Sequence, residues 1–154
     1  MAKRVSFKDL NARVFVFEFE SPDGELMEVE MRALAPDELL DIDMAVATPE
    51  APITDFKTGD NGEVQPVRDY QDKGYKRALT KAGQERMYRQ ILKAWVDPDI
   101  PGDTEAEQLA EIAALPLWAL DGLWQAVRRV TEAGVGTLRA RTFQPDAAPD
   151  DGGV

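Results

Sequence analysis

Apolar and polar residues alternate along two neighbouring stretches near the start of the chain. In residues 12–20 (ARVFVFEFE) three phenylalanines fall on one side, and residues 25–33 (ELMEVEMRA) place Met27, Val29 and Met31 on one side in the same way. Period-two alternation of good β-formers predicts strands with one buried face, and the intervening SPDG is typical of a turn. We therefore predict a β-hairpin over 12–33. Its Phe/Met face must pack on helices or on another protein, because two strands alone are marginally stable in water.

Apolar residues spaced three and four apart predict a helix over 116–133. One face of this helix carries Leu117, Leu120, Trp124, Val127 and Val130. Pro116 suits a first helical turn, and Gly134 stands where a glycine commonly ends a helix. The same spacing predicts a core helix over 69–96, whose row from Met87 to Val96 is expected to pack against the 116–133 stripe. Gly74 and Gly83 weaken its first half and make a break near Gly83 plausible.

Two shorter helices are expected at 36–47 and 104–114. The first begins with Pro36 and acidic residues but has no capping oxygen at Ala35. The second begins with a capping-box pattern, in which Thr104 and Glu107 each satisfy a free backbone N–H. Between the first two helices, residues 48–68 hold three prolines and little periodicity, so we expect a mobile loop there. Its DFKTGDNGE sequence resembles a calcium loop only superficially, because the ligand spacing and the sixth-position glycine fail.

The predicted fold class is therefore α+β and mainly α, with a β-hairpin followed by a small bundle of about four helices. Residues 1–136 are expected to form one domain. Residues 137–154 are rich in Pro, Gly, Ala and Asp, and we expect a flexible acidic C-terminal tail.

Composition excludes several function classes. The chain of 154 residues has a formal net charge of −11, which disfavours nucleic acid and anionic membranes as partners. It contains no cysteine and no histidine, so thiolate chemistry and the usual neutral-pH acid–base group are absent. No apolar run is long enough for a membrane span. Because no catalytic or cofactor motif occurs, we expect no enzyme, no cofactor and no metal.

The charge is unevenly distributed. Residues 25–63 hold 11 acids against two bases, whereas residues 73–93 hold seven bases and one acid. The basic stretch is either a solvated face complemented by the acidic half or a docking surface for an acidic partner.

The order of the segments resembles the phage tail assembly chaperone family of long-tailed phages and prophages. The resemblance rests on four pieces in sequence: the hairpin segment KDLNARVFVFEFESPDGELMEVEMRAL, the helix start LAPDELL, the helix and acidic turn ERMYRQILKAWVDPDIPGD, and the final LPLWALDGLWQAVRRVTEAG. It covers roughly residues 3 to 136. The long 48–68 insertion and the missing leucine–serine pair before the final glycine depart from the family's pattern.

This resemblance implies a non-enzymatic role in virion assembly. Such chaperones bind the tape measure protein in the host cell cytoplasm and keep it soluble until the tail tube protein polymerises around it. They are absent from the mature virion. The alternatives are a tail-completion or head–tail connector structural protein, which would form a ring, and an acidic bacterial adaptor protein.

Candidate partner-binding residues lie off the main stripe of the 116–133 helix. Trp118 stands opposite that stripe, so it either covers the preceding helix through Ile112 and Leu115 or is an exposed aromatic anchor. Together with Arg128 and Arg129, it is predicted to contribute to binding of the client or to self-association.

Overall fold

The computed structural model describes residues 4–10 and 14–132. The predicted elements occur in the predicted order, and the fold class is confirmed: an N-terminal antiparallel hairpin precedes four helices, and the described residues are mainly helical. The elements are α1 (Phe7–Leu10), β1 (Val14–Glu20), β2 (Leu26–Arg32), α2 (Pro36–Ala45), β3 (Ile53–Thr58), β4 (Val64–Arg68), α3 (Lys73–Ala94), α4 (Glu105–Ala113) and α5 (Leu117–Glu132). The predicted tail at 137–154 lies outside the described residues. No helix of the described part is long and apolar enough to cross a membrane.

The β1–β2 hairpin has the predicted register and turn. Phe17 pairs with Val29, so the Phe and Met side chains share one face. Gly24 adopts a positive φ of 86°, and its N–H donates to the carbonyl of Ser21 (2.9 Å). The Ser21 hydroxyl donates to the Asp23 carboxylate and accepts from the N–H of Glu25 (3.1 Å). The turn therefore satisfies its own polar groups, which fixes the register of both strands.

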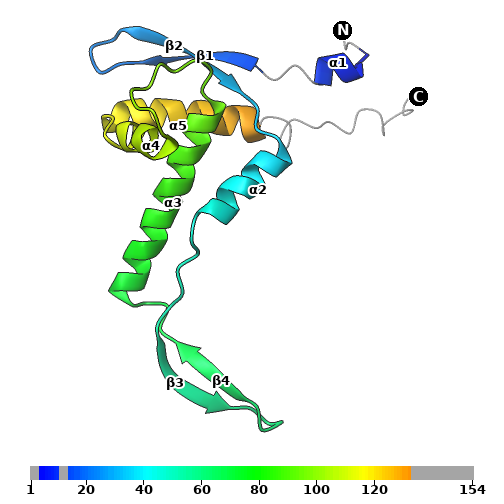
Figure 1. The fold of residues 1–154 in the computed structure, drawn as a ribbon, viewed down its shortest axis with the longest axis vertical. Helices are drawn as coiled ribbons and strands as arrows, with labels where there is room; N and C mark the ends of the chain where they lie inside the picture. The colour runs from blue at the N-terminus through cyan, green and yellow to red at the C-terminus, as the bar shows by residue number, and fades with distance from the viewer. Residues whose placement is uncertain (1–3, 11–13, 133–154) are drawn as a thin grey trace, which may run out of the picture.

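One core joins this hairpin to the helices. Met31, Ile91, Ile112 and Val127 are the largest fully buried side chains, and they come from β2, α3, α4 and α5 respectively. Helix α5 lies between the hairpin and α3, as Figure 1 shows. The end of α3 is tied to the hairpin, because the N–H of Val96 donates to the carbonyl of Glu30 (3.0 Å) beside a Met31–Trp95 bridge.

The buried face of α5 differs from the predicted stripe in one place. Leu120 and Val127 are buried as expected, and Trp124 and Val130 pack against the core. Leu117, however, is 82% exposed. It is the first residue of α5, whereas Leu123 and Ala126, which the predicted stripe did not include, are buried. The β1–β2 hairpin and α3 both cover α5. The buried face of α5 is therefore wider than the predicted stripe.

The expectation of a loop over 48–68 is wrong for most of that segment. Strands β3 and β4 form a second antiparallel hairpin, closed by a turn in which Gly62 has a φ of 79°. All residues of both strands are exposed except Arg68, which is half-buried. Since neither face is covered, the sequence lacks the alternation that marks a strand packed on a core.

Helix α3 runs unbroken through Gly83, so the break considered at that residue is not observed. Its N-terminus is capped by Asp72, whose side chain accepts from the N–H of Tyr75 (2.8 Å). The second half of α3 lies in the core, and the first half extends away from the other helices toward the β3–β4 hairpin (Figure 1).

Helix α2 starts without a capping hydroxyl, as predicted, but its first turn is held in another way. Glu38 accepts from the N–H of Ala35 (3.0 Å) and from both terminal nitrogens of Arg32 (3.0 and 2.5 Å). Chiefly because of the Arg32 hydrogen bonds, the pKa of Glu38 falls from 4.5 to about 2. The paired guanidinium and carboxylate therefore connect β2 to α2.

The lowered pKa predicts a pH-dependent contribution to stability. A carboxylate whose pKa is depressed by folding stabilises the fold fully above its unfolded value of 4.5, and this contribution declines as the pH falls toward 2. Glu38→Gln should cost about 2 kcal/mol near neutral pH after allowance for solvent screening, and less than half of that at about pH 3. Urea unfolding of both proteins at the two pH values measures this. An equal cost at both would contradict the assigned role of Arg32.

Candidate binding pocket

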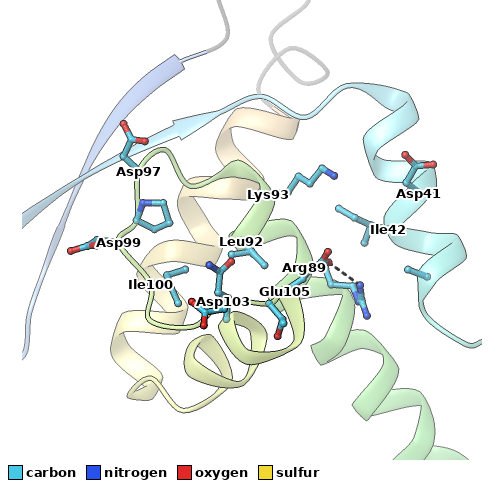
Figure 2. Close-up of a pocket in the computed structure, with 14 residues that line it drawn as sticks. Asp41, Ile42, Arg89, Leu92, Lys93, Asp97, Asp99, Ile100, Asp103 and Glu105 are labelled. Carbon is cyan, nitrogen blue, oxygen red and sulfur yellow. Dashed lines mark hydrogen bonds and ion pairs between the residues drawn. The ribbon is translucent and has the colours of Figure 1, made fainter.

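The candidate site is an open pocket of about 710 Å³ between α2, α3, the 95–104 connection and the start of α4. Its apolar part is formed by Ile42, Ala45, Leu92, Pro98 and Ile100. Five carboxylates and two basic side chains surround this part, for a formal net charge of −3. They are Asp41, Asp97, Asp99, Asp103, Glu105, Arg89 and Lys93, and Figure 2 shows how they come from separate segments. We call this site the acidic pocket.

The wall formed by residues 97–103 depends on unusual backbone conformations. Asp97 and Asp99 have positive φ angles of 47° and 53°, which Asp tolerates better than most residues. Gly102 has a φ of 120°, and a Cβ at this position would approach the Cβ of Glu107 to 2.8 Å. Proline, aspartate and glycine therefore fold this short connection tightly, and Figure 2 shows the Asp97 and Asp99 side chains pointing outward from it.

The first turn of α4 completes this wall. The Thr104 hydroxyl accepts from the N–H of Glu107 (3.2 Å), and Glu107 accepts from the N–H of Asp103 (2.8 Å). The predicted capping box therefore forms with one difference. The Glu107 carboxylate accepts from the backbone N–H of Asp103 rather than from that of Thr104.

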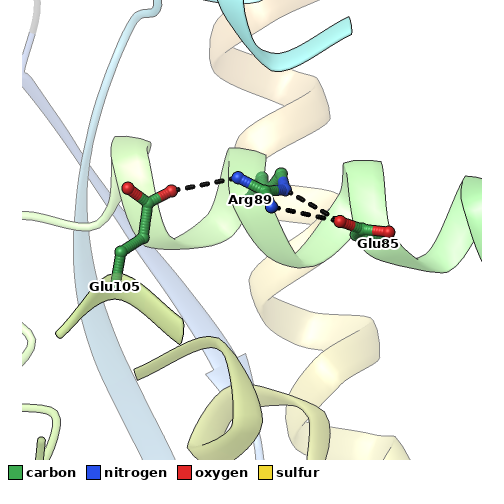
Figure 3. Close-up of polar contacts among 3 residues, drawn as sticks. All are labelled: Glu85, Arg89 and Glu105. Carbon is green, nitrogen blue, oxygen red and sulfur yellow. Dashed lines mark hydrogen bonds and ion pairs between the residues drawn. The ribbon is translucent and has the colours of Figure 1, made fainter. Parts of the chain in front are cut away.

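Arg89 joins the two helices that flank the acidic pocket. Its guanidinium donates to Glu85 on the same helix (3.1 and 3.2 Å) and to Glu105 at the start of α4 (3.2 Å), as Figure 3 shows. Only about a quarter of the Arg89 side chain is exposed. Arg89 therefore serves mainly to hold α4 against α3, and the remaining acids of the rim leave the pocket negative.

The acidic pocket suits an amphipathic segment that carries positive charge. Its apolar part can receive aliphatic side chains, while the carboxylates attract Lys or Arg at the rim, and together these are the elements of helix-in-groove recognition. Among the described residues, no group of three or more Asp or Glu side chains is arranged to hold a metal ion.

The structure separates the residues predicted from sequence to bind a partner. Trp118 is half-buried against Phe19 of β1, with ring centroids 6.2 Å apart and a tilted geometry. It therefore packs on the hairpin, which neither sequence interpretation of Trp118 anticipated. Trp118 and Arg128 are ten residues apart on α5, or about 15 Å at 1.5 Å per residue.

Arg128 lines a smaller pocket of about 290 Å³ together with Asp43, Gln90 and Thr131. Arg129 is exposed on α5. None of the three predicted residues lines the acidic pocket, and their role in partner binding stays a prediction. The available sequence signal for the pocket is the acidic turn DPDIPGD, which the family resemblance includes only as the end of the preceding helix segment.

Comparison of the chain with protein families, curated proteins and solved structures finds no match.

Proposed function

We propose that this chain is a non-enzymatic phage tail assembly chaperone that binds the tape measure protein and keeps it soluble during tail tube assembly. The order of its segments resembles that family, and the acidic pocket is the observation that carries the proposal. A mainly helical client with apolar and basic residues would find aliphatic contacts at Ile42 and Ile100 and opposite charge at the rim. In this proposal the protein acts in the host cell cytoplasm and leaves before the virion matures.

The physical properties of the chain support such a role. Its net charge of −11 keeps a complex with an apolar client dispersed through mutual repulsion. Electrostatic attraction at the rim of a pocket mainly accelerates encounter and sets orientation, which suits a client that must later be released to the tail tube protein.

Co-purification tests the proposal at the pocket. The tagged chain should retain a phage tape measure protein, and Asp41→Lys should weaken binding by about tenfold, equivalent to about 1.4 kcal/mol. Glu18→Lys is the matched control, since it makes the same charge change on the outward face of β1. Equal binding by both variants and the unchanged chain would contradict binding at the acidic pocket.

Light scattering separates the proposal from the connector alternative. A stable ring of six or more subunits would favour a head–tail connector and contradict the chaperone. Gene neighbours unrelated to phage tails would instead favour the acidic bacterial adaptor.

A further inference from the structure

The β3–β4 hairpin carries an apolar face that nothing in the described part of the chain covers. Phe56 pairs with Pro66 and Thr58 pairs with Val64, so these side chains share one face of the sheet. The register shifts between Ile53 and Asp55, and this bulge returns Ile53 to the same face, where it pairs with Arg68. Phe56 is 64% exposed, and Ile53 and Val64 are exposed as well.

This hairpin has little to stabilise it within one copy of the chain. Two-stranded sheets are marginal in water unless one face packs on something. Strands β3 and β4 contact each other extensively but no other strand or helix to a comparable degree. At the base of the hairpin, the Arg68 guanidinium donates to the carbonyl of Ala51 (2.7 Å). The N–H of Asp69 donates to the carbonyl of Pro52 (2.9 Å). The structure thus anchors the base of the hairpin while leaving its apolar face open to a partner.

The first half of α3 provides a second open surface next to this hairpin. It carries four bases and no acid between residues 73 and 81, namely Lys73, Lys76, Arg77 and Lys81. Among the described residues, the ion pairs made by α3 use Arg86 and Arg89 in the second half of the helix, and none uses these four bases. In the second half of α3, Arg86 and Arg89 therefore pair with acids of the same chain. The bases of the first half, residues 73–81, make no such ion pair.

Apolar side chains accompany the bases on this half of α3. Leu79 is exposed one turn after Tyr75, whose ring makes an edge-to-face contact with exposed Tyr70. Residues four apart lie on the same face of a helix. This surface therefore combines an apolar strip with adjacent positive charge.

The two surfaces complement each other in charge and length. The hairpin, residues 53–68, holds three acids and two bases, and its acids Asp60 and Glu63 stand at the turn end, whereas residues 73–81 hold only bases. The six residues of β3 span about 20 Å at 3.4 Å per residue, and residues 73–82 of α3 span about 15 Å at 1.5 Å per residue. Both surfaces belong to one continuous arm, which Figure 1 shows extending from the body of the molecule. A two-fold axis across that arm brings each hairpin onto the α3 helix of the other copy.

We propose that the arm, residues 50–82, is the interface between two copies of this chain. The β3–β4 hairpin of each copy lies on the first half of α3 of the other, with Phe56 against the apolar strip and Asp60 and Glu63 against the basic side chains. The inference is independent of the proposed function, because it concerns only how the chain pairs with itself.

Sedimentation equilibrium of the full chain at micromolar concentrations tests this proposal. The unchanged protein should have twice the mass of the chain, and Phe56→Asp should weaken the dimer by at least about tenfold, as expected for a buried aromatic anchor. Val67→Asp is the matched control, because exposed Val67 lies on the opposite face of the hairpin and pairs with Asp55. Circular dichroism checks that both variants retain the fold.

Charge reversal gives a second readout that does not depend on the apolar face. The variant Lys76→Glu/Arg77→Glu and the variant Asp60→Lys/Glu63→Lys should each dimerise more weakly, and their mixture should recover the dimer mass. A monomeric unchanged chain, an intact Phe56→Asp dimer, or a mixture as weak as its components would overturn the proposal.

Discussion

Replacing Gly122 with alanine should destabilise the protein by about 2 kcal/mol, although alanine is the better helix former by about 1 kcal/mol. A Cβ at this position would lie 2.5 Å from Cδ2 of Phe19 and 2.8 Å from two further ring atoms. The ring cannot easily move away, because Trp118 packs against it and the paired strands fix its backbone. The added methyl group therefore pushes the β1–β2 hairpin off α5. Thermal unfolding should show a loss of several degrees in Tm.

The matched control is Gly83→Ala, in the middle of α3. A Cβ at Gly83 would meet nothing within 4 Å, so this variant should gain up to about 1 kcal/mol from helix propensity alone. Opposite signs for the two substitutions are the expected result. A stabilised Gly122→Ala would show that the hairpin does not rest on α5 as described.

Met31→Ala should cost about 3 kcal/mol, because it removes a fully buried side chain from the place where the hairpin meets the helices. Met31 is 0% exposed, and its backbone forms the bridge to Trp95 at the end of α3. The substitution leaves a cavity among residues from different elements, which cannot all close around it. Urea unfolding would measure the loss.

Met44→Ala makes the same chemical change at a residue that is 77% exposed on α2. It should alter the free energy of unfolding by less than about 0.5 kcal/mol. Similar losses for both methionine variants would contradict the position of the core.

The parts of the fold that were predictable from sequence are those that bury one face. The β1–β2 hairpin has period-two apolar positions because its Phe/Met face packs on α5, and α5 is periodic because it covers the core. The structure has all four predicted helices within the predicted ranges, since proline starts, caps and apolar spacing agree there. Leu117 was misplaced because periodicity locates a stripe but does not tell how far each neighbouring element reaches along the helix.

The β3–β4 hairpin was missed for a physical reason. It buries neither face, its bulge at Thr54 breaks the period, and Pro66 in β4 looks like a loop residue. The Asn61–Gly62 pair was the available signal, since Asn-Gly is a strong hairpin turn. The same lack of burial that hid the hairpin leaves its apolar face open to a second copy.

The acidic pocket could not be assembled from sequence, because Asp41 and Asp99 belong to segments that meet only through the packing of α2 and α4 on α3. Trp118 was recognised as lying off the main stripe, but its contact with Phe19 depends on the hairpin crossing α5. Helical periodicity describes one element at a time and carries no information on such crossings.

Co-expression with a phage tape measure protein, the client that the proposed function names, is the measurement that tests the account most directly. With this chain present, the tape measure protein should move from the pelleted to the soluble fraction of the lysate, and the Asp41→Lys variant should recover markedly less of it than the Glu18→Lys control. A tape measure protein that is equally insoluble with and without the chain would contradict the chaperone function.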